Sequence, residues 1–161
     1  MRKIILTLLV LILTTATAFA KVEVENQSDS YVNYKSTKKI VKFPSYDIFQ
    51  FVKKSMRDGD YNFYIKYTTF DANNIVYAEK ADVNIDGDIY PIEKSSSTEQ
   101  DAFYDVPEWL AKEICNAKSE VKITIYFEKD TKPRTVKLSN QDRIDIDTLY
   151  PLRYSDWTRI K

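Results

Sequence analysis

The sequence predicts a mainly β protein: a two-layer, antiparallel, β-sandwich-like domain of seven to nine strands, with one short α-helix at about residues 107–117. Three observations support this fold class. Apolar and polar residues alternate along several segments, as they do in strands with one buried face. The only two glycines both lie in Asp-Gly-Asp sequences, which are typical of hairpin turns. The 12 tyrosines and 8 phenylalanines, with many valines and isoleucines, favour pleated sheets.

The chain divides into three regions. Residues 1–20 have the parts of a cleavable secretory signal: a basic pair, an apolar run, and the small-x-small site Ala18-Phe19-Ala20. The apolar run is too short for a membrane-spanning helix, which needs about 20 residues. We therefore expect an exported protein, periplasmic or secreted. A single β-rich domain is expected over 21–150, followed by a C-terminal tail over 151–161.

Alternation of apolar and polar residues is strongest in three segments, Tyr61 to Thr69, Ala81 to Ile85 and Val121 to Phe127. Residues 44–56 fit either a helix or a strand. We prefer a strand there, because an Asp-Gly turn and the Tyr61 segment follow. Weaker strand patterns occur at 22–25, 31–34, 40–43, 48–54, 133–138 and 143–147.

The helix is predicted from its start and from its apolar stripe. Asp105 and Glu108 have the spacing of a capping box, and Pro107 suits a first turn. The residues of the stripe are Val106, Leu110, Ile114 and Ala117. The polar stretch 94–100 that precedes the helix is expected to be an exposed loop.

The segment from Asp82 to Glu93 has the spacing of a calcium-binding EF-hand loop. Gly87 occupies the position of the sharp bend. An EF-hand needs a helix on each side, however, and Pro91 falls where the second helix would begin. Calcium binding is therefore kept as an alternative function, with no other cofactor expected. Its candidate ligands are Asp82, Asn84, Asp86, Asp88 and Glu93.

A β-hairpin explains more residues of the same segment. With Asp86-Gly87 as a two-residue type I′ turn, Val83 pairs with Tyr90 and Ala81 pairs with Ile92. The apolar residues then share one face, and the polar residues face solvent. We prefer the hairpin.

Catalytic chemistry is limited by the residues present. The chain has no histidine, which excludes Ser-His-Asp triads, Cys-His pairs and His-ligated metal sites. Cys115 is the only cysteine, and we expect a buried thiol. Asp145 and Asp147 would share one face of a strand and suggest a carboxylate-based hydrolase, but we prefer a solvated strand face as their explanation. We expect no enzyme and rank the hydrolase third.

The charge balance limits the partners. Arg2 and Lys3 belong to the signal, so 22 of the 24 basic residues remain beside 24 acidic residues, a net charge of −2. This balance favours neither nucleic acid nor a membrane surface. Tyr34, Tyr64 and Tyr126 fall on the presumed solvent faces of their strands. Since exposed aromatic rings bind proteins or sugars, we expect a protein or glycan partner held by a strand face or edge.

The sequence from Val106 to Tyr126 places a short helix directly before a strand. It reads Val-Pro-Glu-Trp-Leu-Ala-Lys-Glu-Ile-Cys-Asn-Ala-Lys-Ser-Glu-Val-Lys-Ile-Thr-Ile-Tyr. This run, and the order of strands and turns from Phe49 to Leu149, resembles small exported bacterial β-sandwich proteins of unknown function. The resemblance implies a β-sandwich and brings no catalytic residues with it.

Overall fold

The computed structural model describes residues 22–42, 45–71, 77–128 and 132–160. The signal predicted over residues 1–20 lies outside this range and stays a prediction. Among the described residues, none of the helices has both the length and the apolar character that a membrane crossing requires.

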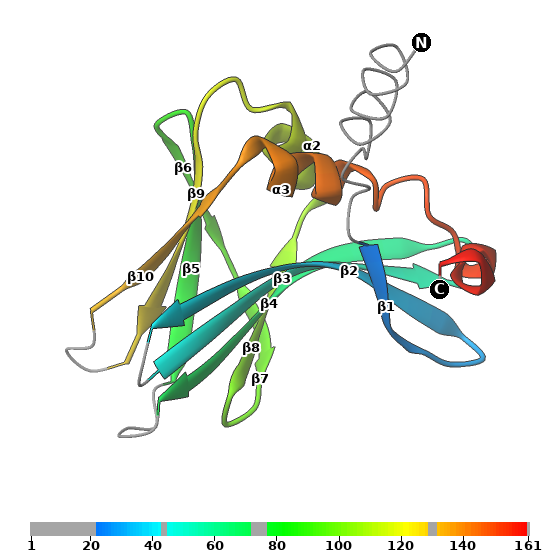
Figure 1. Ribbon diagram of the computed structural model, residues 1–161, viewed down its shortest axis with the longest axis horizontal. Helices are drawn as coiled ribbons and strands as arrows, with labels where there is room; N and C mark the ends of the chain where they lie inside the picture. Colours follow the sequence, from blue (N-terminus) through cyan, green and yellow to red (C-terminus); the bar gives the residue numbers. More distant parts are fainter. Residues whose placement is uncertain (1–21, 43–44, 72–76, 129–131, 161) are drawn as a thin grey trace, which may run out of the picture.

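Two antiparallel sheets pack together, so the predicted β-sandwich-like fold class is confirmed (Figure 1). The described residues form ten strands and two α-helices, however, where seven to nine strands and one short helix were predicted. The first sheet has the order β1-β2-β3-β4-β8-β7. Its strands are β1 (Val22–Gln27), β2 (Tyr31–Lys42), β3 (Ser45–Met56), β4 (Tyr61–Asp71), β8 (Asp101–Val106) and β7 (Lys94–Ser97). The second sheet has the order β10-β9-β5-β6. Its strands are β10 (Arg134–Leu138), β9 (Val121–Phe127), β5 (Ala78–Ile85) and β6 (Asp88–Ile92).

Helices cover one end of the sandwich. Helix α2 (Glu108–Asn116) joins β8 to β9 and lies beside α3 (Asn140–Asp147), which follows β10. The chain then crosses to the first sheet and ends in the 3-10 helix η1 (Tyr154–Arg159), which contacts β2. The tail predicted as a separate region therefore packs on the domain, and Trp157 is half-buried against the core.

The core consists of the inward faces of both sheets and the apolar side of α2. Residues alternate between buried and half-buried along β9, as the sequence predicted. The same alternation buries Phe63, Ile65 and Tyr67 on β4. Residues 45–56 form β3, which pairs with β2 on one side and β4 on the other, so the preference for a strand there was correct.

The hairpin predicted around Asp86-Gly87 is confirmed. Asp86 has a φ of 54° and Gly87 a φ of 109°, the two positive values that a type I′ turn needs. Val83 pairs with Tyr90, and Ala81 pairs with Ile92. The turn geometry thus sets the register that brings the apolar residues to one face.

The strand predicted at 143–147 is wrong, because these residues belong to α3. The helix begins with a capping box, in which the Ser139 side chain accepts a bond from the Asp142 backbone and the Asp142 carboxylate accepts one from the Ser139 backbone. Gln141 Nε2 then donates to Asp145 Oδ1 at 2.7 Å, one helical turn later. Since residues two apart lie on roughly opposite sides of a helix, Asp145 and Asp147 do not share a face.

Two further expectations near α2 need correction. The capping box predicted for Asp105 does not form, because Asp105 belongs to β8 and its backbone N–H donates to the carbonyl of Glu93 at 3.2 Å. Pro107 occupies the N-cap position instead. The exposed loop predicted at 94–100 begins as the edge strand β7, which pairs with β8.

Candidate functional site

Tyr34 does not lie on a solvent face, contrary to the prediction. It is fully buried on the inner face of β2, where its backbone pairs with Lys53. Its hydroxyl donates to the carbonyl of Arg153 at 2.6 Å, which fastens the C-terminal segment to the sheet. Burial, together with the charge of Asp156, raises the pKa of Tyr34 to about 12. Tyr34 is therefore a core residue with a satisfied hydroxyl.

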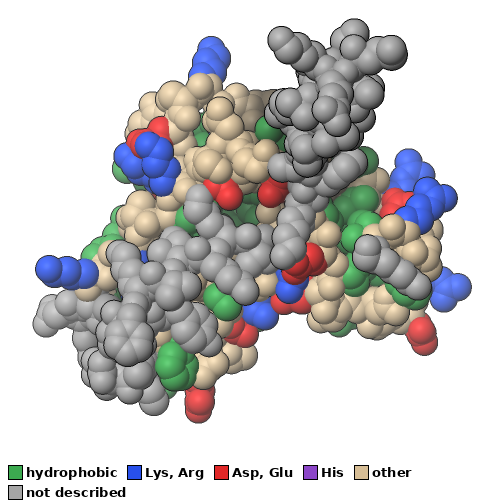
Figure 2. Space-filling model, viewed as in Figure 1, with side chains coloured by type: hydrophobic (Ala, Val, Ile, Leu, Met, Phe, Trp, Pro, Cys, Tyr) green, Lys and Arg blue, Asp and Glu red, His purple; other side chains and the backbone are tan. Residues whose placement is uncertain are grey.

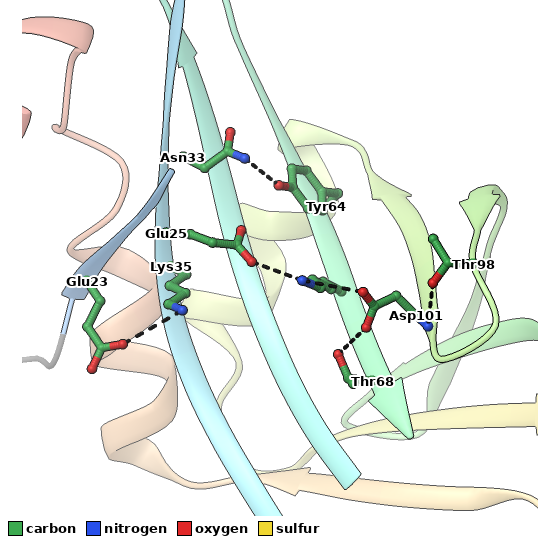
Figure 3. A network of polar contacts seen from close by, with 9 residues as sticks. Glu23, Glu25, Asn33, Lys35, Tyr64, Thr68, Thr98 and Asp101 are labelled. Carbon is green, nitrogen blue, oxygen red and sulfur yellow. Dashed lines mark hydrogen bonds and ion pairs between the residues drawn. The ribbon is translucent and has the colours of Figure 1, made fainter. Parts of the chain in front are cut away.

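Tyr64 is half-buried in a polar network on the outward face of the first sheet (Figure 3). Asn33 Nδ2 donates to the Tyr64 hydroxyl at 3.0 Å, and the Tyr64 ring lies 6.0 Å from that of Phe103. Lys66 joins the network through ion pairs with Glu25 at 3.1 Å and Asp101 at 3.6 Å. These contacts hold Tyr64 in place on the sheet.

Tyr126 lies on the outward face of the second sheet. It is half-buried, and Lys80 Nζ lies 4.9 Å from the centre of its ring. A hydrogen bond with Asp82 is the main reason why its pKa is raised. Because Tyr64 and Tyr126 occupy the outward faces of two different sheets, the predicted binding tyrosines do not form one surface.

The predicted calcium ligands are spread along the β5–β6 hairpin. Asp82 contacts Tyr126, and Asn84 Oδ1 accepts a bond from the backbone of Gly87 at 3.1 Å. Asp88 and Glu93 are exposed. Within the part of the chain that the structure describes, no three Asp, Glu or Cys residues come close enough to hold a metal ion.

Asp86 connects this hairpin to the loop between α2 and β9. Its carboxylate accepts backbone N–H bonds from Lys118 at 3.0 Å, Ser119 at 3.0 Å and Glu120 at 2.9 Å. The Ser119 hydroxyl also donates to it, at 2.6 Å. These bonds, that of the Ser119 hydroxyl first, lower the pKa of Asp86 to about 2. The carboxylate thus holds the loop between α2 and β9 against the β5–β6 hairpin.

Replacing Asp86 with asparagine is expected to destabilise the protein above pH 3.8 and to make its stability less dependent on pH below that value. The pKa of Asp86 is lower in the folded chain than in the unfolded chain. Its contribution is therefore fully present above pH 3.8 and is lost as the pH falls to about 2. Urea unfolding across this range measures the effect. Equal pH dependence of the parent and Asp86→Asn would contradict the assigned role, and Asp88→Asn is the matched control.

The remaining catalytic candidates are not arranged as a reactive site. Burial, followed by the charge of Asp147, raises the pKa of Cys115 to about 12, so the thiol is protonated at neutral pH. Asp145 is engaged by Gln141 on α3. Neither the thiol nor the aspartates lines the groove described next.

An aromatic groove of about 540 Å³ lies where the chain passes from the second sheet to the first. Strand β6 ends at Ile92 and β7 begins at Lys94, so the edges of both sheets meet at this point. The other side of the groove is formed by the start of β4, the end of β8 and the start of α2. Its buried floor consists of Phe63, Ile92, Val106 and Leu110.

Two aromatic side chains stand over this floor. The rings of Tyr90 and Trp109 are 5.6 Å apart and nearly perpendicular, at 72°. Trp109 is 54% exposed, although it lies directly beside the buried Leu110. Pro91, which follows Tyr90 directly, and Pro107, two residues before Trp109, also line the groove. The result is an apolar surface that is partly open to solvent.

The rim of the aromatic groove is polar and acidic. Asn62, Glu93 and Asp105 are exposed and line it. Among the described residues that line the groove there is no Lys or Arg. The groove therefore combines the exposed Trp109 and the half-buried Tyr90 with two carboxylates and one amide group.

Sequence reasoning did not find this groove. Trp109 is not among the binding residues that the sequence predicts, and Tyr90 enters the sequence analysis only as the hairpin partner of Val83. The available signal was the pairing of each aromatic residue with a nearby proline, Tyr90 with Pro91 and Trp109 with Pro107. Proline is tolerated at edge strands and in the first turn of a helix, so an aromatic residue close to it lies at the edge of an element.

The chain was compared with protein-family models, with curated proteins and with solved structures. None of the three comparisons found a match.

Proposed function

We propose that this chain is an exported, non-catalytic binding protein whose aromatic groove holds an extended segment of a partner protein. The observation that carries this proposal is the exposed Trp109, which stands perpendicular to Tyr90 above a buried apolar floor. The partner segment has a proline or another apolar residue beside Lys or Arg. The signal-like sequence at residues 1–20 supports export.

The exposure of Trp109 supports binding because tryptophan is the side chain that gains most from burial against a partner. Tryptophan and tyrosine dominate the energetics of interfaces, and they bind best in preformed pockets. Grooves lined by aromatic residues are also the usual sites for proline-rich extended peptides. The perpendicular pair of Trp109 and Tyr90 presents two flat surfaces for such residues.

The negative charge at the rim of the groove favours a basic protein segment as the partner over a neutral glycan. Glu93 and Asp105 place two carboxylates at the rim, without a cation among the described lining residues. Opposite charge on the partner increases the association rate and selects the partner. Strand β6 is the edge of its sheet in the described residues, so an extended segment can also approach its backbone.

The proposal is tested by peptide titration. The chain has two tryptophans, so Trp157→Phe leaves Trp109 as the sole fluorescent reporter. We expect proline-rich peptides with flanking Lys or Arg to change its emission, and peptides with flanking Glu to have no effect. Trp109→Ala should weaken binding by at least about 2 kcal/mol, or roughly 30-fold, as measured by calorimetry. Trp157→Phe is the matched control and should bind like the parent.

Two results would contradict the proposal. One is peptide binding that Trp109→Ala leaves unchanged. The other is binding of a neutral oligosaccharide, and not of the basic peptides, with the same dependence on Trp109; the partner would then be a glycan. The double variant Glu93→Gln/Asp105→Asn adds a check on charge, since it should reduce the salt dependence of peptide binding.

A further inference from the structure

A second pocket, of about 520 Å³, lies between the β3–β4 hairpin and residues 150–155, which follow α3. It shares no lining residue with the aromatic groove. Among the described residues that line it, the cations are Lys53, Arg57 and Arg153, and the one acidic residue is Asp60. We call it the basic pocket.

Lys53 supplies a fixed positive charge to the inner wall of the basic pocket. It is only 3% exposed, and its Nζ donates to the carbonyls of Tyr150 at 2.5 Å and Leu152 at 3.0 Å. The ammonium also lies 4.5 Å from the centre of the Tyr61 ring. These direct partners are neutral, while the carboxylates of Glu108 and Asp156 also attract the ammonium and Arg153 repels it. Burial lowers the pKa of Lys53, as expected for a cation removed from water.

Arg57 and Arg153 are exposed and line the same pocket, Arg57 from the turn after β3 and Arg153 from the segment that follows α3. Neither guanidinium forms an ion pair with a carboxylate of the described residues. Asp29 and Asp58 line an adjoining hollow with Arg57, again without an ion pair. The basic pocket therefore has three cations and one lining carboxylate, that of Asp60.

We propose that the basic pocket binds a small molecule through a phosphate or carboxylate group, with Arg57 and Arg153 as the direct ligands of that group. The guanidinium has the planar, forked geometry that suits both kinds of anion. The exposed ring of Tyr61 and the half-buried Leu152 provide surface for an uncharged part of the ligand. The volume lies within the usual range for small-molecule sites, about 300–1,000 Å³.

Isothermal titration calorimetry tests the proposal with four probes: inorganic phosphate, phenyl phosphate, phenylacetate and the neutral benzyl alcohol. We expect at least one anion to bind and benzyl alcohol not to bind. Arg57→Gln and Arg153→Gln should each weaken that binding about tenfold, the usual effect of losing a bond to a charged group. Arg159→Gln removes the same charge from η1, outside the pocket, and should change binding by less than about twofold.

The probes also distinguish the sources of the anion. Tighter binding of phenyl phosphate or phenylacetate than of inorganic phosphate identifies an organic ligand, and equal binding of the two phosphates identifies the inorganic ion. The proposal is overturned if no anion binds, if benzyl alcohol binds as tightly as the anions, or if Arg159→Gln weakens binding as much as the pocket variants do. Because Arg57 and Arg153 are exposed, thermal melting of the variants should match the parent and exclude misfolding.

Discussion

Replacing Asp47 with alanine is expected to lower the free energy of unfolding by about 3 kcal/mol, the lower end of the usual effect of breaking a buried ion pair, because Asp47 is buried and Arg134 is half-buried. Asp47 is buried on β3 and accepts hydrogen bonds from the Tyr67 hydroxyl at 2.7 Å and the Thr69 hydroxyl at 3.1 Å. It also forms an ion pair with Arg134 on β10, which belongs to the other sheet. The substitution therefore leaves the Arg134 guanidinium, half-buried at the sheet interface, without this carboxylate.

Urea unfolding at neutral pH measures this effect. Asp47→Asn keeps the size of the side chain and removes its charge, so its stability should lie between those of Asp47→Ala and the parent. Asp88→Ala removes an exposed carboxylate from an edge strand and should change stability by less than about 0.5 kcal/mol. A loss no larger for Asp47→Ala than for Asp88→Ala would show that the ion pair does not hold the two sheets together.

Replacing Lys53 with alanine is expected to destabilise the protein by about 3 kcal/mol and to loosen residues 150–155. The substitution removes a buried side-chain stem and the donor to the Tyr150 carbonyl. Leu152 loses one of its two donors and keeps the Ser55 hydroxyl at 3.0 Å. We therefore expect amide hydrogen exchange, compared with the parent, to increase more in residues 150–155 than in β9. The urea midpoint should also be lower than that of the parent.

Lys54→Ala is the matched control for Lys53→Ala. Lys54 is the next residue on β3 and points to the opposite face, where its Nζ lies 4.4 Å from the centre of the Tyr31 ring. Losing that contact should cost no more than about 1 kcal/mol. Equal stability losses for the two lysine variants, or unchanged exchange in residues 150–155, would contradict the role assigned to Lys53.

The local features of the fold could be predicted because each depends on neighbouring residues. Alternation along Val121 to Phe127 identified β9, and Asp86-Gly87 identified both the turn and the register of the β5–β6 hairpin. The strand expected at 143–147 failed because a short Ile-Asp alternation fits two structures. Only Ile146 is buried there, whereas Ile144 is 54% exposed. The Ser139 and Asp142 capping box was the local signal for a helix.

The candidate sites were much harder to predict. The aromatic groove takes its residues from β4, β6, β8 and α2, and the basic pocket takes its residues from β3, the following turn and the C-terminal segment. Their residues are far apart in the sequence, and no spacing rule joins them. The calcium-loop spacing over 82–93, in contrast, is easy to see in the sequence. It does not predict a site, because the hairpin distributes these residues along two strands.

The sequence by itself determined the fold class of this protein, because strand periodicity and turn chemistry act over a few residues and survive in any arrangement of the strands. Tertiary structure alone decided which aromatic side chains meet solvent. Tyr34 lies under the C-terminal segment and is fully buried, whereas Trp109 is exposed to solvent beside Tyr90. The physical reason is that exposure depends on which distant segment covers a side chain, and that contact is made only when the two sheets and the C-terminal segment pack together.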